Sequence, residues 1–178
     1  MELNKEFIAL IAAIGLFAGT LITAFTNYLL HVSRQSHEWK VEKNRRKIEK
    51  GEQLYEALIQ YKKLIFTSHM SWISCLDGGF KPSEIGDKAD EILKDNPGYK
   101  GVGDKVVLIS GVYFPDISMM VNEARIELKP ANSVLFNMQS GKIDDKSKAK
   151  NTILDAGRNF DAKVDKILAL LSAKIRKL

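Results

Sequence analysis

The sequence predicts an all-α protein: one N-terminal transmembrane helix continuing into a long stalk helix, followed by an antiparallel cytosolic helical bundle. Three observations lead to this fold class. Residues 7–30 contain no charged side chain, and residues 31–50 are almost entirely polar. Residues 51–178 then repeat apolar side chains at the three- and four-residue intervals of amphipathic helices.

Residues 7–30 are long enough to cross a membrane as a helix. At about 1.5 Å per residue they extend over about 36 Å, whereas the hydrocarbon core of a bilayer is about 30 Å thick. A buried helix of a soluble protein rarely stays apolar on every face over this length. A cleaved secretory signal is the alternative interpretation, but its apolar core is usually shorter and its basic charge lies on the opposite flank.

The two flanks of this segment differ strongly in charge. Residues 1–6 contain one basic and two acidic side chains, whereas residues 31–50 contain seven basic and three acidic ones. Basic flanks are retained on the cytoplasmic side of a membrane. We therefore expect residues 1–6 to form a short extracytoplasmic tail and residues 31–178 to lie in the cytoplasm. The single Cys75 fits a reducing compartment.

Small residues recur on one face of the predicted transmembrane helix. Gly15, Gly19 and Thr23 lie four residues apart and therefore share a face. Small side chains let two membrane helices approach closely. The spacing resembles the glycophorin-type dimerisation motif, which implies a homodimer or a higher homo-oligomer. Because such residues are also common in helices that only anchor a protein, self-association and simple anchoring are both open interpretations.

Residues 31–50 have the composition of a basic juxtamembrane stalk. Anionic headgroups attract each nearby basic side chain by about 1 kcal/mol, so membrane lipids are an expected partner. Nucleic acid is not an expected partner, because few aromatic side chains are interleaved with the basic ones for base stacking. The side chains that we expect to contact anionic lipid are Arg34, Lys40, Lys43, Arg45, Arg46 and Lys47.

The first bundle helix is expected to continue the stalk as far as about Leu76. Gly78 and Gly79 follow and end it. Its apolar residues form a broad buried stripe, which Tyr55, Ile59 and Phe66 widen. The stripe itself consists of Leu54, Leu58, Tyr61, Ile65, Trp72 and Cys75.

The segment between residues 104 and 140 is less regular. Residues 106–114 are rich in β-branched and aromatic side chains and are compatible with a strand. We favour a helix capped by Asp104 and broken before Pro115, because the sequence shows no second strand to pair with. Helical intervals continue beyond Pro115, with a further interruption at Pro130.

The last helix is predicted from about Asp144 to Arg176. Its apolar residues step by four and three, which is typical of a seam that closes a bundle or pairs two subunits. We favour the bundle, because the helix that ends near Leu76 offers an apolar partner within the same chain. The lane consists of Ile153, Gly157, Phe160, Val164, Ile167, Leu171, Lys174 and Leu178.

Residues that carry chemistry do not form a catalytic pattern. His31 and His37 are six residues apart, which does not place both on one metal ion. His69 lies beside the apolar stripe and is expected to be a packing residue whose hydrogen bonds are satisfied, and Cys75 a buried thiol. We therefore predict no catalytic, cofactor-binding or metal-binding site, and no enzyme.

The order of features resembles a recurring type of uncharacterised bacterial or phage-encoded single-span protein. The resemblance rests on the short tail, the span that carries Gly and Thr, the run Arg34–Lys40 and a helical domain containing Tyr113, Phe114 and Pro115. It implies an all-α cytosolic domain, and it transfers no catalytic residue.

Two functions follow as expectations. The first is a non-enzymatic anchor or adaptor, which presents the bundle to an unidentified cytosolic protein partner or to a second copy of the chain. The alternative is an oligomerising, membrane-perturbing effector of a bacterial antiphage defence system, in which the face of Gly15, Gly19 and Thr23 gathers several spans.

Overall fold

The computed structural model describes the backbone of residues 5–178 and the side chains of residues 14–17 and 19–178. Every regular element in this described part is a helix and none is a strand, which confirms the predicted all-α class. The chain divides into two compact units, Met1–Arg46 and Lys47–Leu178, and each unit is described by itself.

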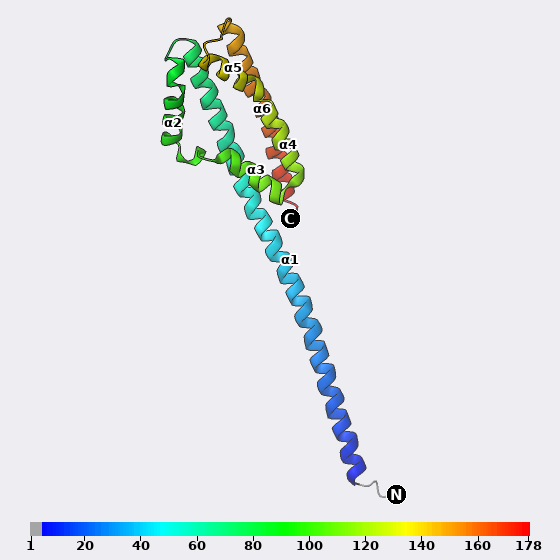
Figure 1. Ribbon diagram of the computed structural model, residues 1–178. Coiled ribbons are helices and arrows are strands. Elements are labelled where there is room, and N and C mark those ends of the chain that lie inside the picture. The colour runs from blue at the N-terminus through cyan, green and yellow to red at the C-terminus, as the bar shows by residue number, and fades with distance from the viewer. Residues whose placement is uncertain (1–4) are drawn as a thin grey trace. The chain divides into compact units, whose positions relative to one another are not determined.

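The first helix, α1, extends over Lys5–Leu76 (Figure 1) and therefore contributes to both units. Its length confirms the prediction of one helix reaching about Leu76. The helix ends because Gly78 adopts a left-handed conformation, with φ 85°. The N–H of Gly79 then donates to the carbonyl of Ser74 at 2.9 Å, which satisfies an otherwise unpaired carbonyl of the last turn.

The second unit consists of residues 47–76 of α1 and a series of shorter helices that ends in a second long one. All four prolines of the chain lie in the first turn of a helical element, where the missing N–H costs nothing. The elements after α1 are η1 (Pro82–Glu84), α2 (Ile85–Asp95), η2 (Pro97–Tyr99), α3 (Val102–Tyr113), α4 (Pro115–Ile126), α5 (Lys129–Gln139) and α6 (Lys146–Ile175).

The structure decides how residues 106–114 fold. They belong to α3 and the Phe114 junction, so the helical prediction is confirmed and the strand is excluded. Asp104 as the N-cap is wrong: Gly101 holds that position with φ 67°, and Asp104 lies in the first turn of α3. The break before Pro115 is confirmed, because Phe114 leaves the helical conformation, with φ −142° and ψ 66°, as the disfavoured helical region before a proline requires.

The core lies between α6 and the helices that pack on it, with α6 against α4 and α5 and α3 against α4 (Figure 1). The predicted lane of α6 is confirmed from Ile153 to Leu171, where its large side chains are at most 1% exposed. It is wrong beyond that point, because Lys174 is exposed and Leu178 lies past the end of the helix and is 38% exposed. Phe160 sits at the centre and meets the edge of the Tyr61 ring, with 5.2 Å between ring centroids. The buried lane consists of Ile153, Phe160, Val164, Ile167 and Leu171.

Helix α1 buries a narrower stripe than the sequence predicts. Leu54 and Leu58 are fully buried, whereas Tyr55 is 38% and Phe66 60% exposed. The prediction that Tyr55 and Phe66 widen the stripe is therefore wrong. The apolar residues of α1 cover more of its circumference than the helices packed on it, so these two rings are left at the surface.

Candidate functional site

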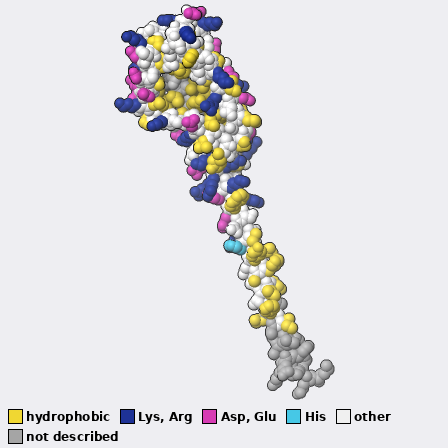
Figure 2. All heavy atoms as spheres, viewed as in Figure 1, with side chains coloured by type: hydrophobic (Ala, Val, Ile, Leu, Met, Phe, Trp, Pro, Cys, Tyr) yellow, Lys and Arg dark blue, Asp and Glu magenta, His cyan; other side chains and the backbone are white. Residues whose placement is uncertain are grey.

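The described side chains of the apolar segment of α1, at residues 14–17 and 19–30, are exposed within the first unit. Figure 2 shows this stretch as a band of hydrophobic side chains that precedes a cluster of Lys and Arg. The described part of α1 is long and apolar enough to cross a membrane, and none of the most apolar window is buried. The large side chains here, between 51% and 74% exposed, are Ile14, Leu16, Phe17, Leu21, Ile22, Phe25, Tyr28, Leu29 and Leu30.

The predicted self-association residues form an open, smooth lane along this segment. A Cβ atom at Gly15 or Gly19 would meet nothing within 4 Å. The hydroxyl of Thr23 donates to the carbonyl of Gly19 at 2.8 Å, so it is satisfied within its own helix. At about 3.6 residues per turn, Phe17 and Leu21 lie on the opposite side. Ile22, three residues after Gly19, lies beside the small residues, so Gly15, Gly19 and Thr23 form a narrow lane and not a whole face.

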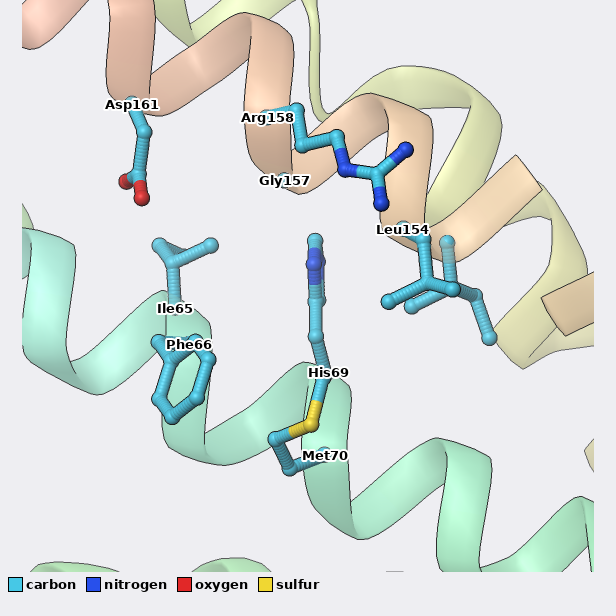
Figure 3. A pocket seen from close by; sticks show the side chains of 9 residues that line it. Ile65, Phe66, His69, Met70, Leu154, Gly157, Arg158 and Asp161 are labelled. Atoms are coloured by element: carbon cyan, nitrogen blue, oxygen red, sulfur yellow. The ribbon is translucent and has the colours of Figure 1, made fainter. Parts of the chain in front are cut away.

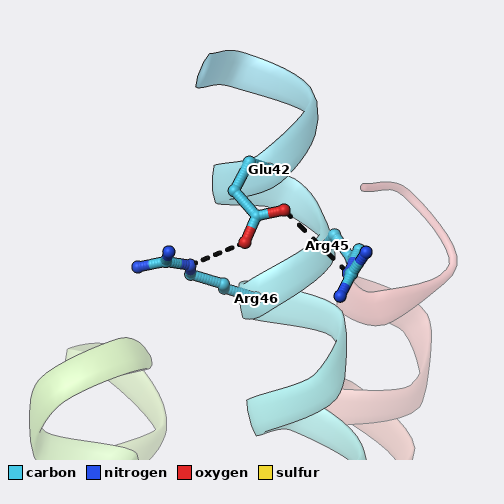
Figure 4. Close-up of polar contacts among 3 residues, drawn as sticks. All are labelled: Glu42, Arg45 and Arg46. Carbon is cyan, nitrogen blue, oxygen red and sulfur yellow. Dashed lines mark hydrogen bonds and ion pairs between the residues drawn. The ribbon is translucent and has the colours of Figure 1, made fainter. Parts of the chain in front are cut away.

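Five of the six predicted lipid-contacting residues lie in the first unit, and two of them share one acidic partner. Glu42 accepts a hydrogen bond from Arg46 Nε at 2.8 Å and lies 4.0 Å from Arg45 Nε (Figure 4). The hydrogen bond from Arg46 holds the pKa of the Glu42 carboxyl below its usual range. The side chains of Arg45 and Arg46 nevertheless stay 77% and 71% exposed, so both can still face anionic headgroups.

Lys43 and Lys47 each contact an aromatic ring. Lys43 Nζ lies 5.2 Å from the centroid of the Trp39 ring, and Trp39 is 66% exposed. Lys47 belongs to the second unit, where its Nζ lies 6.0 Å from the centroid of the buried Phe114 ring. The structure therefore separates Lys47 from the other five basic residues. Contact with Phe114 gives it a role in the bundle that its sequence neighbours do not share.

Within the second unit, the structure places a cavity between α1 and α6 that the sequence analysis did not predict (Figure 3). His69 lies at its base and is 2% exposed, which confirms it as a packing residue. The prediction that its hydrogen bonds are satisfied is wrong, because no described residue forms a hydrogen bond with the imidazole. Its ring lies 5.0 Å from the Trp72 ring, and burial lowers the pKa of the imidazole to about 4. The only sequence signal for this cavity is Gly157, a residue without a side chain within the apolar lane of α6.

Cys75 is a buried free thiol, as predicted, and burial raises its pKa. A thiol in this state is a poor nucleophile. Among the residues that the structure describes, no three His, Cys, Asp or Glu side chains gather to form a candidate metal site.

The fold and these surfaces define a class: an all-helical chain whose one long N-terminal helix meets the length and composition of a membrane span. A scan against protein-family models and searches of curated proteins and of solved structures find no match to this chain.

Proposed function

We propose that this chain is a single-pass inner-membrane protein of a bacterium that presents a cytosolic helical bundle for protein interaction or self-association, without enzymatic activity. The observation that carries the proposal is the exposed apolar segment of α1. Contiguous apolar surface of this extent is covered by lipid or by protein in a working molecule. Because the length of the apolar segment matches the thickness of a bilayer, lipid is favoured over protein as its cover.

The basic residues after the segment support an orientation with the N-terminus outside. They follow the span directly, where positive charge is retained on the cytoplasmic side. Arg45 and Arg46 keep most of their side-chain surface accessible, although both interact with Glu42. They are therefore able to contact anionic lipid while the stalk helix stays intact.

Paired contacts between α1 and α6 support the antiparallel arrangement of the bundle. A Cβ at Gly51 would lie 2.7 Å from Ile175 Cδ1, and Lys62 Nζ lies 2.7 Å from Asp165 Oδ1. Beyond the end of α1, Asp77 accepts a hydrogen bond from Lys150. Over these three contacts the residue numbers rise on the side of α1 (51, 62 and 77) and fall along α6 (175, 165 and 150), as they do between antiparallel helices.

The membrane proposal is tested by charging the apolar segment. Replacing Leu21 and Phe25 together by arginine should move the chain from the alkali-washed membrane pellet to the supernatant, because each arginine at mid-membrane costs about 3 kcal/mol. The matched control replaces Leu108 and Phe136, each 66% exposed in the bundle, by arginine and should stay in the pellet. A wild-type chain found in the supernatant without detergent contradicts the proposal.

Self-association through the small-residue lane is tested by Gly19→Ile. The larger side chain should reduce the yield of crosslinked dimer of the full-length chain in membranes by about tenfold, because it prevents close approach of two helices. The yield is measured with an amine-reactive crosslinker under reducing conditions. Ala24→Ile adds a similar bulk away from that lane and should leave crosslinking unchanged. Equal crosslinking of both variants and wild type would remove the dimerisation role of Gly15, Gly19 and Thr23.

The alternative function, a membrane-perturbing effector of an antiphage system, rests on the same open lane. An effector and an anchor differ in their effect on the membrane potential of cells that overexpress the chain. Overexpression of an effector depolarises cells, and Gly19→Ile abolishes that effect, whereas an anchor leaves the membrane potential intact in both cases.

A further inference from the structure

The cavity between α1 and α6 has apolar walls and few polar groups. Its volume is about 170 Å³. Helix α1 contributes Ile65, Phe66 and Met70 beside His69, and α6 contributes Leu154 and Ile153 (Figure 3). A concave apolar site with a small number of placed polar groups is the usual form of a binding pocket.

His69 is the polar group at the base of this cavity. Its side chain points from α1 towards α6 at Gly157 (Figure 3), where a Cβ atom would lie 3.0 Å from Nδ1. No residue in the described part of the chain forms a hydrogen bond with the imidazole. Every side-chain nitrogen or oxygen that is fully buried in the described part has a hydrogen-bond partner. The imidazole nitrogens have none, so they are not fully buried. The ring is 2% exposed, so its nitrogens reach accessible surface only through the cavity.

The size of the cavity selects the class of ligand. A pocket of about 150 Å³ lined by aliphatic and aromatic side chains accommodates a single benzene ring. The cavity is of this class, and the unpartnered imidazole favours a ring that also carries a hydrogen-bonding group. We propose that the cavity binds a single phenol ring, whose hydroxyl forms a hydrogen bond with His69.

Two charged residues, Arg158 and Asp161, line the cavity and can contact the groups to which the phenol ring is attached. Arg158 is exposed and lies 3.5 Å from Asp155, whereas Asp161 is partly buried on the same helix. Burial raises the pKa of the Asp161 carboxyl. Both side chains offer hydrogen bonds to a peptide backbone that follows a tyrosine side chain into the cavity. The phenol is therefore either a free small molecule or the tyrosine of a partner.

The test is a titration of the full-length chain with p-cresol, observed through ¹³C-labelled methionine methyl groups. The chain is held in lipid nanodiscs, or in buffer if it proves soluble. Met70 lines the cavity, whereas Met119 and Met138 lie elsewhere and serve as internal references. The Met70 resonance should shift with saturation at a Kd of about 1 mM, a value expected for a ligand of this size. Absence of saturation, or equal shifts at all three methyls, overturns the proposal.

Toluene and two variants test the geometry. Toluene should bind about fivefold more weakly than p-cresol, because it lacks the hydroxyl that pairs with His69. In His69→Leu, which is apolar and similar in size, the two ligands should bind equally. Phe66→Ala removes a wall and should weaken both, whereas Phe136→Ala, at a ring of similar exposure outside the cavity, should change neither. Equal affinities for both ligands in the wild type overturn the role of the imidazole.

A second ligand distinguishes the two sources of the phenol. N-acetyl-tyrosinamide carries the same ring on a peptide backbone. Binding at least as strong as that of p-cresol supports a partner's tyrosine, and binding more than tenfold weaker supports a free phenol. Neither result depends on the membrane proposal, because the cavity lies entirely within the second unit.

Discussion

Replacing Phe160 by alanine should lower the free energy of unfolding of the bundle by about 4 kcal/mol. Phe160 is 0% exposed and packs in the centre of the larger core cluster, where its ring meets the edge of the Tyr61 ring at 5.2 Å between centroids. Truncation removes the buried ring, leaves a cavity and abolishes the aromatic contact. Because small domains are stable by only about 5–15 kcal/mol, this loss is a large part of the total.

Urea unfolding of the full-length chain in nanodiscs, followed by Trp72 fluorescence in a Trp39→Phe background, measures this difference. Phe136→Ala is the matched control, because Phe136 is 66% exposed and should cost less than about 0.5 kcal/mol. If Phe160→Ala unfolds at the same urea concentration as the control, the packing of α6 described above is incorrect.

The elements that could be predicted from the sequence are those that a local pattern encodes. The lane of α6 repeats every three to four residues around Phe160, and its large members from Ile153 to Leu171 are buried. The four prolines mark helix starts for a purely local reason, the missing N–H. The apolar segment of α1 is likewise evident from composition alone.

The features that could not be predicted depend on which segments meet in space. Periodicity shows that α1 has apolar residues around much of its surface, but not which of them a neighbour covers, so it places Tyr55 and Phe66 inside although both are exposed. The His69 cavity needs α6 to lie beside α1 with Gly157 facing the imidazole. The contact between Lys47 and Phe114 joins residues far apart in the sequence, and no local pattern encodes it.

The stability of the bundle should fall by about 3 kcal/mol between pH 7 and pH 4 because of His69 alone. Burial lowers the pKa of its imidazole from 6.5 to about 4 in the folded state. The unfolded chain therefore binds a proton between these two values and the folded chain does not. The stability that depends on a neutral His69 is fully present above pH 6.5 and is lost as the pH falls from 6.5 to about 4.

Two carboxyl groups of the bundle with shifted pKa values also change its stability as the pH falls, and they do so in opposite directions. Burial raises the pKa of Asp161, so protonation of this group favours the folded state as the pH falls. The hydrogen bond from Lys174 lowers the pKa of Asp116, so the stability that Asp116 contributes is lost in acid. Comparing a histidine variant with the wild type over one pH series cancels both effects, because the carboxyl groups are present in each chain.

His69→Leu should remove the His69 contribution and give a nearly constant free energy of unfolding between pH 6.5 and pH 4, apart from the carboxyl groups. His37→Leu, at an exposed histidine of the first unit, should retain the full wild-type dependence. Urea unfolding at half-unit steps of pH measures all three chains. If the wild type and His69→Leu lose stability in parallel on acidification, the buried position of His69 is incorrect.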